Sequence, residues 1–339
     1  MNFVMGSNPV ASKPLVFSVI MPCYNSEAYV KNALESIIDQ SWPHWELITV
    51  NDGSIDKTLG ILREYAEKDS RIKVYSKENG GYVSAVNLGL EHISGDYFLM
   101  MGSDDALRTD LFATLADAIG DQQPDCIAFQ TEIIQDGVNL GVESITQFRE
   151  GAAKFQTTLA EFSEEYPGQS EIFFARDTSK CYHQRILGDL RYYGRYGLDA
   201  DGIFSMLLCH KAESFQVIPV VGYYWTVRGD SLSGRKRTFV QICDCVSNWI
   251  QFFREVNRCN YRLAETEKRY LYYLIRLLRS VAAESDSEHR TLVKDAATVI
   301  RETEEQIDYT LDLSRKDQLL LKSPSLWKLL NRVFSWRNN

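Results

Sequence analysis

The sequence lacks long apolar runs and has few residues that bind soft metals. No apolar stretch approaches the ~20 residues that a membrane-spanning helix needs. There are 5 histidines and 7 cysteines, an odd number, and the closest cysteine pair, Cys243 and Cys245, is too tight for a CxxC motif. These absences exclude zinc-finger and disulfide-scaffold patterns. We therefore expect reduced thiols and a cytoplasmic protein.

An excess of positive charge is also missing. The 37 basic residues are outnumbered by 46 acidic ones, giving a net charge of -9, whereas nucleic-acid binders carry a basic surface. We expect no nucleic-acid partner. With 339 residues and 45% hydrophobic content, the chain can form one large domain with an extension, or two domains. Residues 1–13 lack the features of a signal peptide and are predicted to form a flexible tail.

Short apolar runs alternate with helical patterns in the first half of the chain, which is typical of an α/β protein with a parallel sheet. Strands are predicted at 16–21, 46–50, 72–75, 97–101 and 126–132, and helices at 28–40, 58–65, 82–90 and 201–210. The apolar segment 215–225 is expected to be interrupted by Pro219. Since parallel strands share an edge at their carboxyl ends, the polar turns that follow them should gather there.

The most informative segment, residues 96–105 (DYFLMMGSDD), is an apolar strand that ends in two carboxylates. Asp104 and Asp105, without histidine or cysteine beside them, form a hard oxygen site suited to Mn²⁺ or Mg²⁺, which usually accompanies a phosphorylated substrate. The alternative is that they cap the following helix, and both can hold, with Asp105 capping and Asp104 binding the ion.

Several segments, in order along the chain, resemble family 2 glycosyltransferases, which have the GT-A fold. They are residues 18–27 (SVIMPCYNSE), 34–37 with Gln40, 46–56 (ELITVNDGSID), 79–81 with 87–89, 95–97 and 103–105. The resemblance is strong over about residues 16–110 and traceable to about 233. It implies a Rossmann-like mixed, mostly parallel sheet flanked by helices, with an α-helical C-terminal extension.

The resemblance also implies roles for individual residues. It assigns nucleotide binding to Pro22, Tyr24, Glu27, Asp52, Asn79 and Ser103, and the metal ion to Asp104. Ordinary turn chemistry is the alternative at Asp52 and Asn79, and core packing is the alternative at Tyr24. The segment 223–233 resembles the closing loop of the family, in which Arg228 binds the diphosphate; a solvated loop arginine is the alternative.

The catalytic base implied by the resemblance is Asp201, at the start of a predicted helix, with Asp199 in reserve. An acid that only stabilises the first turn of the helix is the alternative. The chain departs from the family at Gly102, where the first Asp of the Asp-x-Asp motif is expected. It also departs at Val86, where many members carry a basic residue.

These features favour an inverting glycosyltransferase that moves a sugar from a nucleotide-diphosphate donor, a UDP-sugar, to a hydroxyl of a glycan or lipid-linked glycan. Cell-surface polysaccharide or glycolipid synthesis is the expected setting. A non-catalytic sugar-nucleotide or glycan-binding protein is the alternative. A nucleotidyltransferase is disfavoured, because residues 22–27 contain neither glycine nor a basic residue.

The expected domains are a GT-A catalytic domain over residues 14–235 and an α-helical extension over 236–339. Within the extension, residues 323–337 form a basic amphipathic helix with two tryptophans. Such a helix either binds an anionic membrane surface peripherally, at the inner face of the membrane, or packs its apolar face on the catalytic domain. Acceptor specificity is expected in the irregular segment 135–196.

Overall fold

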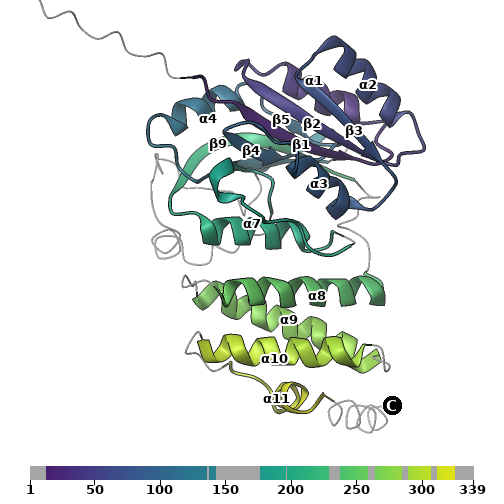
Figure 1. Cartoon of the computed structure of the whole chain (residues 1–339), viewed down its shortest axis with the longest axis vertical. Coiled ribbons are helices and arrows are strands. Elements are labelled where there is room, and N and C mark those ends of the chain that lie inside the picture. Colours follow the sequence, from purple (N-terminus) through teal and green to yellow (C-terminus); the bar gives the residue numbers. More distant parts are fainter. Residues whose placement is uncertain are drawn as a thin grey trace, which may run out of the picture.

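The computed structural model describes residues 13–135, 137–142, 176–195, 197–228, 237–258, 264–284, 289–306 and 311–324. Within these residues the chain forms one mixed sheet flanked by helices, followed by a stack of helices (Figure 1). The predicted α/β class and the helical C-terminal region are confirmed. The helix predicted at 323–337 lies almost entirely outside the described residues.

The sheet has the strand order β3-β2-β1-β4-β8-β6-β9-β5, and β7 pairs with β6 at its side. The pairs β1–β2, β2–β3, β1–β4 and β6–β9 are parallel, and the pairs β4–β8, β6–β8, β6–β7 and β5–β9 are antiparallel. The strand bounds are β1 Phe17–Cys23, β2 Trp45–Asp52, β3 Ile72–Lys77, β4 Tyr97–Met100, β5 Ala106–Leu107, β6 Cys126–Gln135, β7 Val138–Val142, β8 Lys180–His183 and β9 Phe215–Val227.

Pro219 does not interrupt the segment in which it lies, contrary to the sequence prediction. Strand β9 runs through it from Phe215 to Val227. The register with β6 shifts at this point, so that Ala128 pairs with Val217 and Gln130 with Val221. Proline lacks the N–H that a sheet ladder requires, and this irregularity gives it a place where no such bond is made.

Helices cover both faces of the sheet, with α1, α2 and α4 on one face and α3 and α7 on the other (Figure 1). Strand β1 shows why, because Phe17, Val19 and Met21 join the core under α1 and α4 whereas Ile20 joins the core under α3 and α7. The bounds are α1 Val30–Ile38, α2 Thr58–Lys68, α3 Tyr82–Leu90, α4 Leu111–Ile119 and α7 Ala200–Lys211, with a short 3₁₀ helix η2 at Gln184–Ile186.

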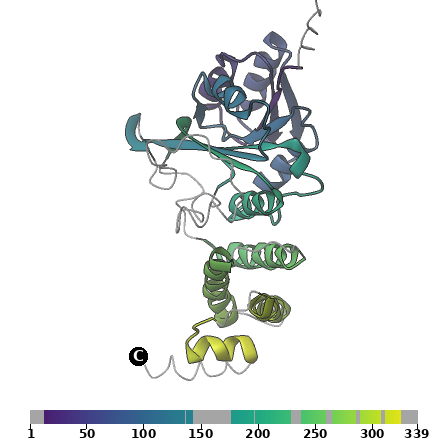
Figure 2. The same cartoon turned by 90° about the vertical axis from the view of Figure 1, so that its left-hand side faces the viewer.

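The extension stacks below α7 in successive layers (Figure 2). Its helices are α8 Phe239–Val256, α9 Ala264–Glu284, α10 Arg290–Gln306 and α11 Arg315–Lys322. A capping box starts α8, where the Thr238 hydroxyl accepts from the Gln241 N–H and the Gln241 side chain accepts from the Thr238 N–H. Buried residues of α8, α9 and α10 belong to the same core as α7 and α3. No helix in the described part of the chain is long and apolar enough to cross a membrane.

Asp125 joins three parts of the sheet, because its buried carboxylate accepts from Arg185 Nε at 2.6 Å and from the N–H groups of Glu213 and Ser214 at 2.8 and 3.1 Å. Asp125→Ala removes three partly buried hydrogen bonds to a charged, buried acceptor. We expect the free energy of unfolding, measured by urea titration, to fall by about 2–4 kcal/mol.

The control is Glu64→Ala, which removes an exposed ion pair with Lys68. It should leave the urea midpoint unchanged. Equal effects of the two substitutions would show that Asp125 has no special part in holding the sheet together.

Candidate active site

The parallel pairing brings the loops that follow β1, β2 and β4 to one edge of the sheet. Cys23 at the end of β1 pairs with Asn51, near the end of β2, and Ile20 pairs with Met100 at the end of β4. The acidic segment predicted to bind a metal ion follows β4 directly. The edge at which ligands bind in open α/β sheets is therefore the edge that carries these loops.

Hydrogen bonds tie the loop after β1 to its neighbours. The Ser26 hydroxyl lies 2.7 Å from the hydroxyl of Ser103, and the Ser26 N–H donates to Thr58 Oγ1 at 2.7 Å. Glu27 Oε2 accepts from the Lys57 N–H at 2.9 Å. Tyr24 is 52% exposed at this edge, which argues against the core role considered for it.

Asp52, at the end of β2, organises the turn that contains Asn79. Its Oδ1 accepts from Lys77 Nζ at 2.8 Å and from the Gly80 N–H at 2.9 Å, and its Oδ2 accepts from the Gly81 N–H at 2.8 Å. Because a carboxylate offers about four acceptor positions, a further donor can still be accommodated. A Cβ at Gly53 would lie 2.6 Å from the backbone nitrogen of Asn79, so the two turns touch directly.

Asp104 and Arg228 meet, although they come from different ends of the predicted site. Arg228 Nη2 lies 2.7 Å from Asp104 Oδ2, and each side chain is about a quarter exposed. The guanidinium of Arg228 also stacks on the Tyr29 ring, 4.3 Å from its centroid. Tyr29 was missed by the sequence analysis, in which nothing distinguished it from a residue at the start of a helix.

Asp105 does not cap a helix, because α4 begins at Leu111 and its N-cap residue is Asp110. Instead its buried carboxylate accepts from the Tyr223 hydroxyl at 2.6 Å and from the Thr226 N–H at 2.8 Å. Burial and the adjacent charge of Asp104 raise the pKa of Asp105 to about 7. Asp105 thus holds the acidic loop against β9.

Gly102 is explained by the same carboxylate. A Cβ at this position would lie 2.4 Å from Asp105 Oδ2 and 2.9 Å from Asp104 Oδ1. The Gly102 N–H donates to the Tyr223 hydroxyl at 3.0 Å. The space in which the side chain of a first acidic residue would begin is therefore filled by Asp105. The second departure, Val86, is fully buried in the core under α3.

Asp201 lies in the first turn of α7, as predicted. Burial and the negative charge of Asp177 raise the pKa of Asp201 to about 7. Asp177 is itself buried and accepts hydrogen bonds from the hydroxyls of Tyr192 and Tyr82. Sequence reasoning missed Asp177, since it lies in a segment without a recognisable pattern.

Arg176 lies within electrostatic reach of both Asp105, after β4, and Asp201, at the start of α7. Its guanidinium stacks on the Trp225 ring at 3.9 Å from the centroid. Its positive charge partly offsets the rise in pKa of both Asp105 and Asp201. The acidic loop after β4 and the start of α7 therefore lie within electrostatic reach of one cation. No sequence signal pointed to this arginine.

The residues of this edge fit a divalent cation whose ligands come partly from the protein and partly from the substrate. Among the described residues there is no group of three or more His, Cys, Asp or Glu side chains that could hold a metal ion alone. Mg²⁺ bound through one or two carboxylates, phosphate oxygens and water needs no such group. The partly exposed carboxylate of Asp104 can supply that single protein ligand.

The mixed α/β sheet with an acidic loop at its carboxyl edge has the GT-A type fold expected from the sequence, which it shares with a solved structure described below. The chain belongs to the family described as Glycosyl transferase family 2, whose family model matches residues 18–190, about half of the chain. The resemblance expected from the sequence is confirmed.

Solved structures and curated proteins are similar to different extents of the chain. Crystalline S. aureus TarS 1-349 in complex with UDP-GlcNAc is similar in fold, with a TM-score of 0.70 and 22% identity over 94% of this chain and 89% of that one. The putative teichuronic acid biosynthesis glycosyltransferase TuaG of Bacillus subtilis is 46% identical over 99 residues, which are 29% of this chain and 39% of TuaG.

A longer stretch matches the minor teichoic acid biosynthesis protein GgaB of Bacillus subtilis, at 28% identity over 236 residues. This match covers 69% of the present chain and 25% of GgaB. The chain thus matches well under half of the length of either B. subtilis protein.

Because the space at Gly102 is crowded, we predict that restoring the usual Asp-x-Asp motif destabilises the protein. Gly102→Asp, which recreates Asp-x-Asp, should lower the stability of the protein by about 1–3 kcal/mol, because the new side chain displaces the Asp105 carboxylate. Urea unfolding measures this loss.

The matched control is Gly60→Ala in α2, where a Cβ meets nothing within 4 Å. Alanine there should raise helix stability by about 0.5–1 kcal/mol. An unchanged urea midpoint in Gly102→Asp would contradict the proposed crowding.

Proposed function

We propose that the chain is an inverting, metal-dependent glycosyltransferase that moves a sugar from a UDP-sugar to a hydroxyl of a glycan or lipid-linked glycan. The observation that carries the proposal is the meeting of Asp104 and Arg228 at the carboxyl edge of the sheet. A structural neighbour was crystallised with UDP-GlcNAc, and two relatives are named for teichuronic and teichoic acid biosynthesis. These names support a UDP-sugar donor and a cell-envelope polysaccharide acceptor.

The donor is proposed to bind across the loops after β1, β2 and β4. Tyr24 and Pro22 flank the uracil, and Asp52, Glu27, Asn79 and Ser103 provide polar contacts to base, ribose or phosphate. Support comes from the gathering of these loops through the contacts of Ser26 with Ser103 and Thr58. The remaining acceptor position of Asp52 suits a nucleotide N–H or hydroxyl donor.

Asp104 would hold Mn²⁺ or Mg²⁺, an ion that neutralises negative charge on a diphosphate leaving group. Arg228 lies beside Asp104, and its planar fork suits the two oxygens of a phosphate. We propose that Arg228 binds the diphosphate of the donor next to the ion on Asp104. Its stacking on Tyr29 holds the guanidinium at this edge of the sheet.

Asp201 is the proposed general base. It takes the proton of the acceptor hydroxyl, whose oxygen forms a bond to the anomeric carbon while the bond from that carbon to the diphosphate oxygen breaks on the opposite face. A single displacement of this kind inverts the anomeric configuration. The raised pKa of Asp201, about 7, supports the assignment, since an effective general base has a pKa near the working pH.

A panel of nucleotide sugars tests the function. We expect at least one UDP-sugar to raise the melting temperature in the presence of Mn²⁺, to lose this effect in EDTA, and to release UDP on incubation. Asp104→Asn should weaken the Mn²⁺-dependent shift. Donor binding without release of UDP, with or without a glycan acceptor, would favour the non-catalytic sugar-nucleotide-binding alternative. A shift that is equal in EDTA would overturn the metal assignment.

The role of Asp201 predicts a pH dependence. A carboxyl accepts a proton only when ionised, so the rate of UDP release should rise with pH up to the pKa of about 7 and then level off. Below that pH, the rate should fall about tenfold per pH unit. Asp201→Asn should lower the rate by at least about 10²-fold and leave donor binding intact. Near-normal turnover in this variant would exclude Asp201 as the base.

A further inference from the structure

Asp199 has an unusual backbone conformation directly before the proposed base. Its φ of 61° and ψ of -3° are left-handed, which non-glycine residues adopt uncommonly. Asp199 occupies the N-cap position of α7, yet its side chain makes no capping hydrogen bond to that helix. An aspartate at this position normally accepts from the N–H groups of the first turn. The carboxylate is therefore used elsewhere.

The carboxylate accepts hydrogen bonds from three side chains of the extension. Arg237 donates from Nη2 to Asp199 Oδ1 at 2.8 Å and from Nη1 to Oδ2 at 3.2 Å. The indole N–H of Trp249, on α8, and the hydroxyl of Tyr273, on α9, donate to Oδ2 at 3.2 and 3.0 Å. The arginine fork, the indole and the phenol thus give the carboxylate four donor contacts, three of them on Oδ2.

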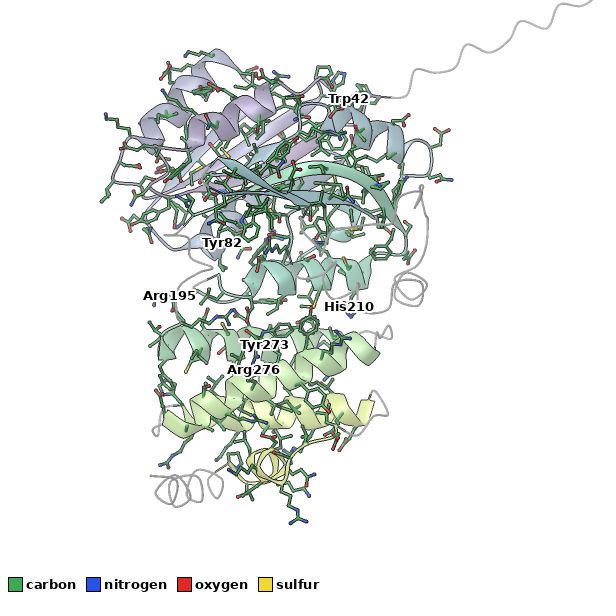
Figure 3. The ribbon with its side chains drawn as sticks, turned by 180° about the vertical axis from the view of Figure 1, so that it is seen from behind. Trp42, Tyr82, Arg195, His210, Tyr273 and Arg276 are labelled. Carbon is green, nitrogen blue, oxygen red and sulfur yellow. The ribbon has the colours of Figure 1, made fainter. Side chains whose placement is uncertain are left out.

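The donors are also ordered among themselves. Arg237 Nη1 donates to the Tyr273 hydroxyl at 2.8 Å. The rings of Trp249 and Tyr273 pack edge to face, with centroids 5.7 Å apart. Figure 3 shows Tyr273 in the layer where the extension meets α7. A network in which each member fixes its neighbour can hold one geometry of the backbone at Asp199.

The loop before Asp199 is confined in the same way. At Gly197, with φ +77°, a Cβ would lie 3.1 Å from the Tyr82 ring of α3. At Gly194, with φ +85°, a Cβ would lie 2.4 Å from the side-chain amide of Asn248 on α8. The chain that leads into α7 therefore passes between α3 and α8 with no room for side chains at these two points.

We infer that Asp199 is a positioning residue, through which Arg237, Trp249 and Tyr273 of the extension fix the first turn of α7 and with it the carboxylate of Asp201. The inference rests on the proposed function for its catalytic meaning. It also removes Asp199 as the reserve base, because its oxygens are committed to these donors. A cavity of about 400 Å³ beside Asp201 is lined by Trp249, Tyr270 and Tyr273 as well, so the extension also shapes the space next to the base.

Steady-state kinetics of UDP release from the best UDP-sugar of the panel tests the inference. Asp199→Ala and Arg237→Ala should each lower kcat by about 10–100-fold and change the donor KM by less than about twofold, since a small displacement of a base slows chemistry without weakening donor binding. The double variant should be no slower than either single variant, because both remove one network. Unchanged kcat in Asp199→Ala would overturn the inference.

Conservative variants separate positioning from loss of folding. Asparagine tolerates the left-handed conformation and keeps one acceptor oxygen for the three donors on Oδ2, whereas its NH2 group faces the donor Arg237 Nη2, so Asp199→Asn should recover part of the lost kcat. Tyr273→Phe keeps the ring and should have an intermediate effect. The matched control is Arg279→Ala, which breaks the ion pair of α9 with Asp317 on α11, away from Asp199. It should lower the melting temperature and leave kcat unchanged. A fall in kcat in this control equal to that of Arg237→Ala would overturn a specific role.

Hydrogen exchange provides a readout that does not depend on activity. Backbone amides of residues 198–204 should exchange faster in Asp199→Ala and Arg237→Ala than in the wild type or in Arg279→Ala. If the wild type releases UDP from no donor, the proposed function fails, and the exchange result still decides whether the extension fixes the start of α7. Equal exchange in all four proteins would overturn that structural claim.

Discussion

The buried carboxylate of Asp105 is the constraint on which the candidate site depends. It accepts from the side chain of Tyr223 and the backbone of Thr226, while Tyr223 accepts from the N–H of Gly102. These bonds join the loop after β4 to the end of β9, two elements far apart in the sequence. Because Asp104 precedes Asp105 and Arg228 follows Thr226 by two residues, the same clamp brings those two side chains together.

Burying these carboxyl groups disfavours their ionised forms, which is consistent with a functional site. Burial and negative neighbours raise the pKa of Asp105 and of Asp201, each to about 7. Carboxylates placed only for stability are usually paired, which lowers their pKa, as the partners of Glu46 do. The ionised form of such a carboxyl is unfavourable, and it is relieved either by a cation bound nearby or by a proton that the carboxyl accepts. Both are what the proposed reaction would bring to this edge of the sheet.

The sequence predicted the strands and helices of the first half, because each buried strand is a continuous apolar run followed by a polar turn. It failed at Pro219, because β9 accommodates the proline in a bulge, where the stretch from Val217 to Val221 lies opposite the shorter stretch from Ala128 to Gln130 of β6. It assigned Asp105 to a helix cap because the real partners, Tyr223 and Thr226, are distant in the sequence. Tyr29 and Arg176 were missed for the same reason: each acts through a tertiary contact that no local pattern encodes.

The sequence suggested a domain boundary near residue 235, and that boundary remains a prediction. The residues on either side of it nevertheless belong to one hydrophobic core. The core that lies under α3 and α7 continues without interruption into α8, α9 and α10. A hydrophobic core shared in this way makes the stability of α7 depend on the extension, and the polar network at Asp199 adds a directional restraint to that dependence. Apolar contacts alone are non-directional and would allow the first turn of α7 to rotate or shift. Hydrogen bonds from a planar guanidinium and an indole require one orientation of the Asp199 carboxylate. The geometry of Asp201 is therefore set as much by the helices that follow it in the chain as by the sheet that precedes it.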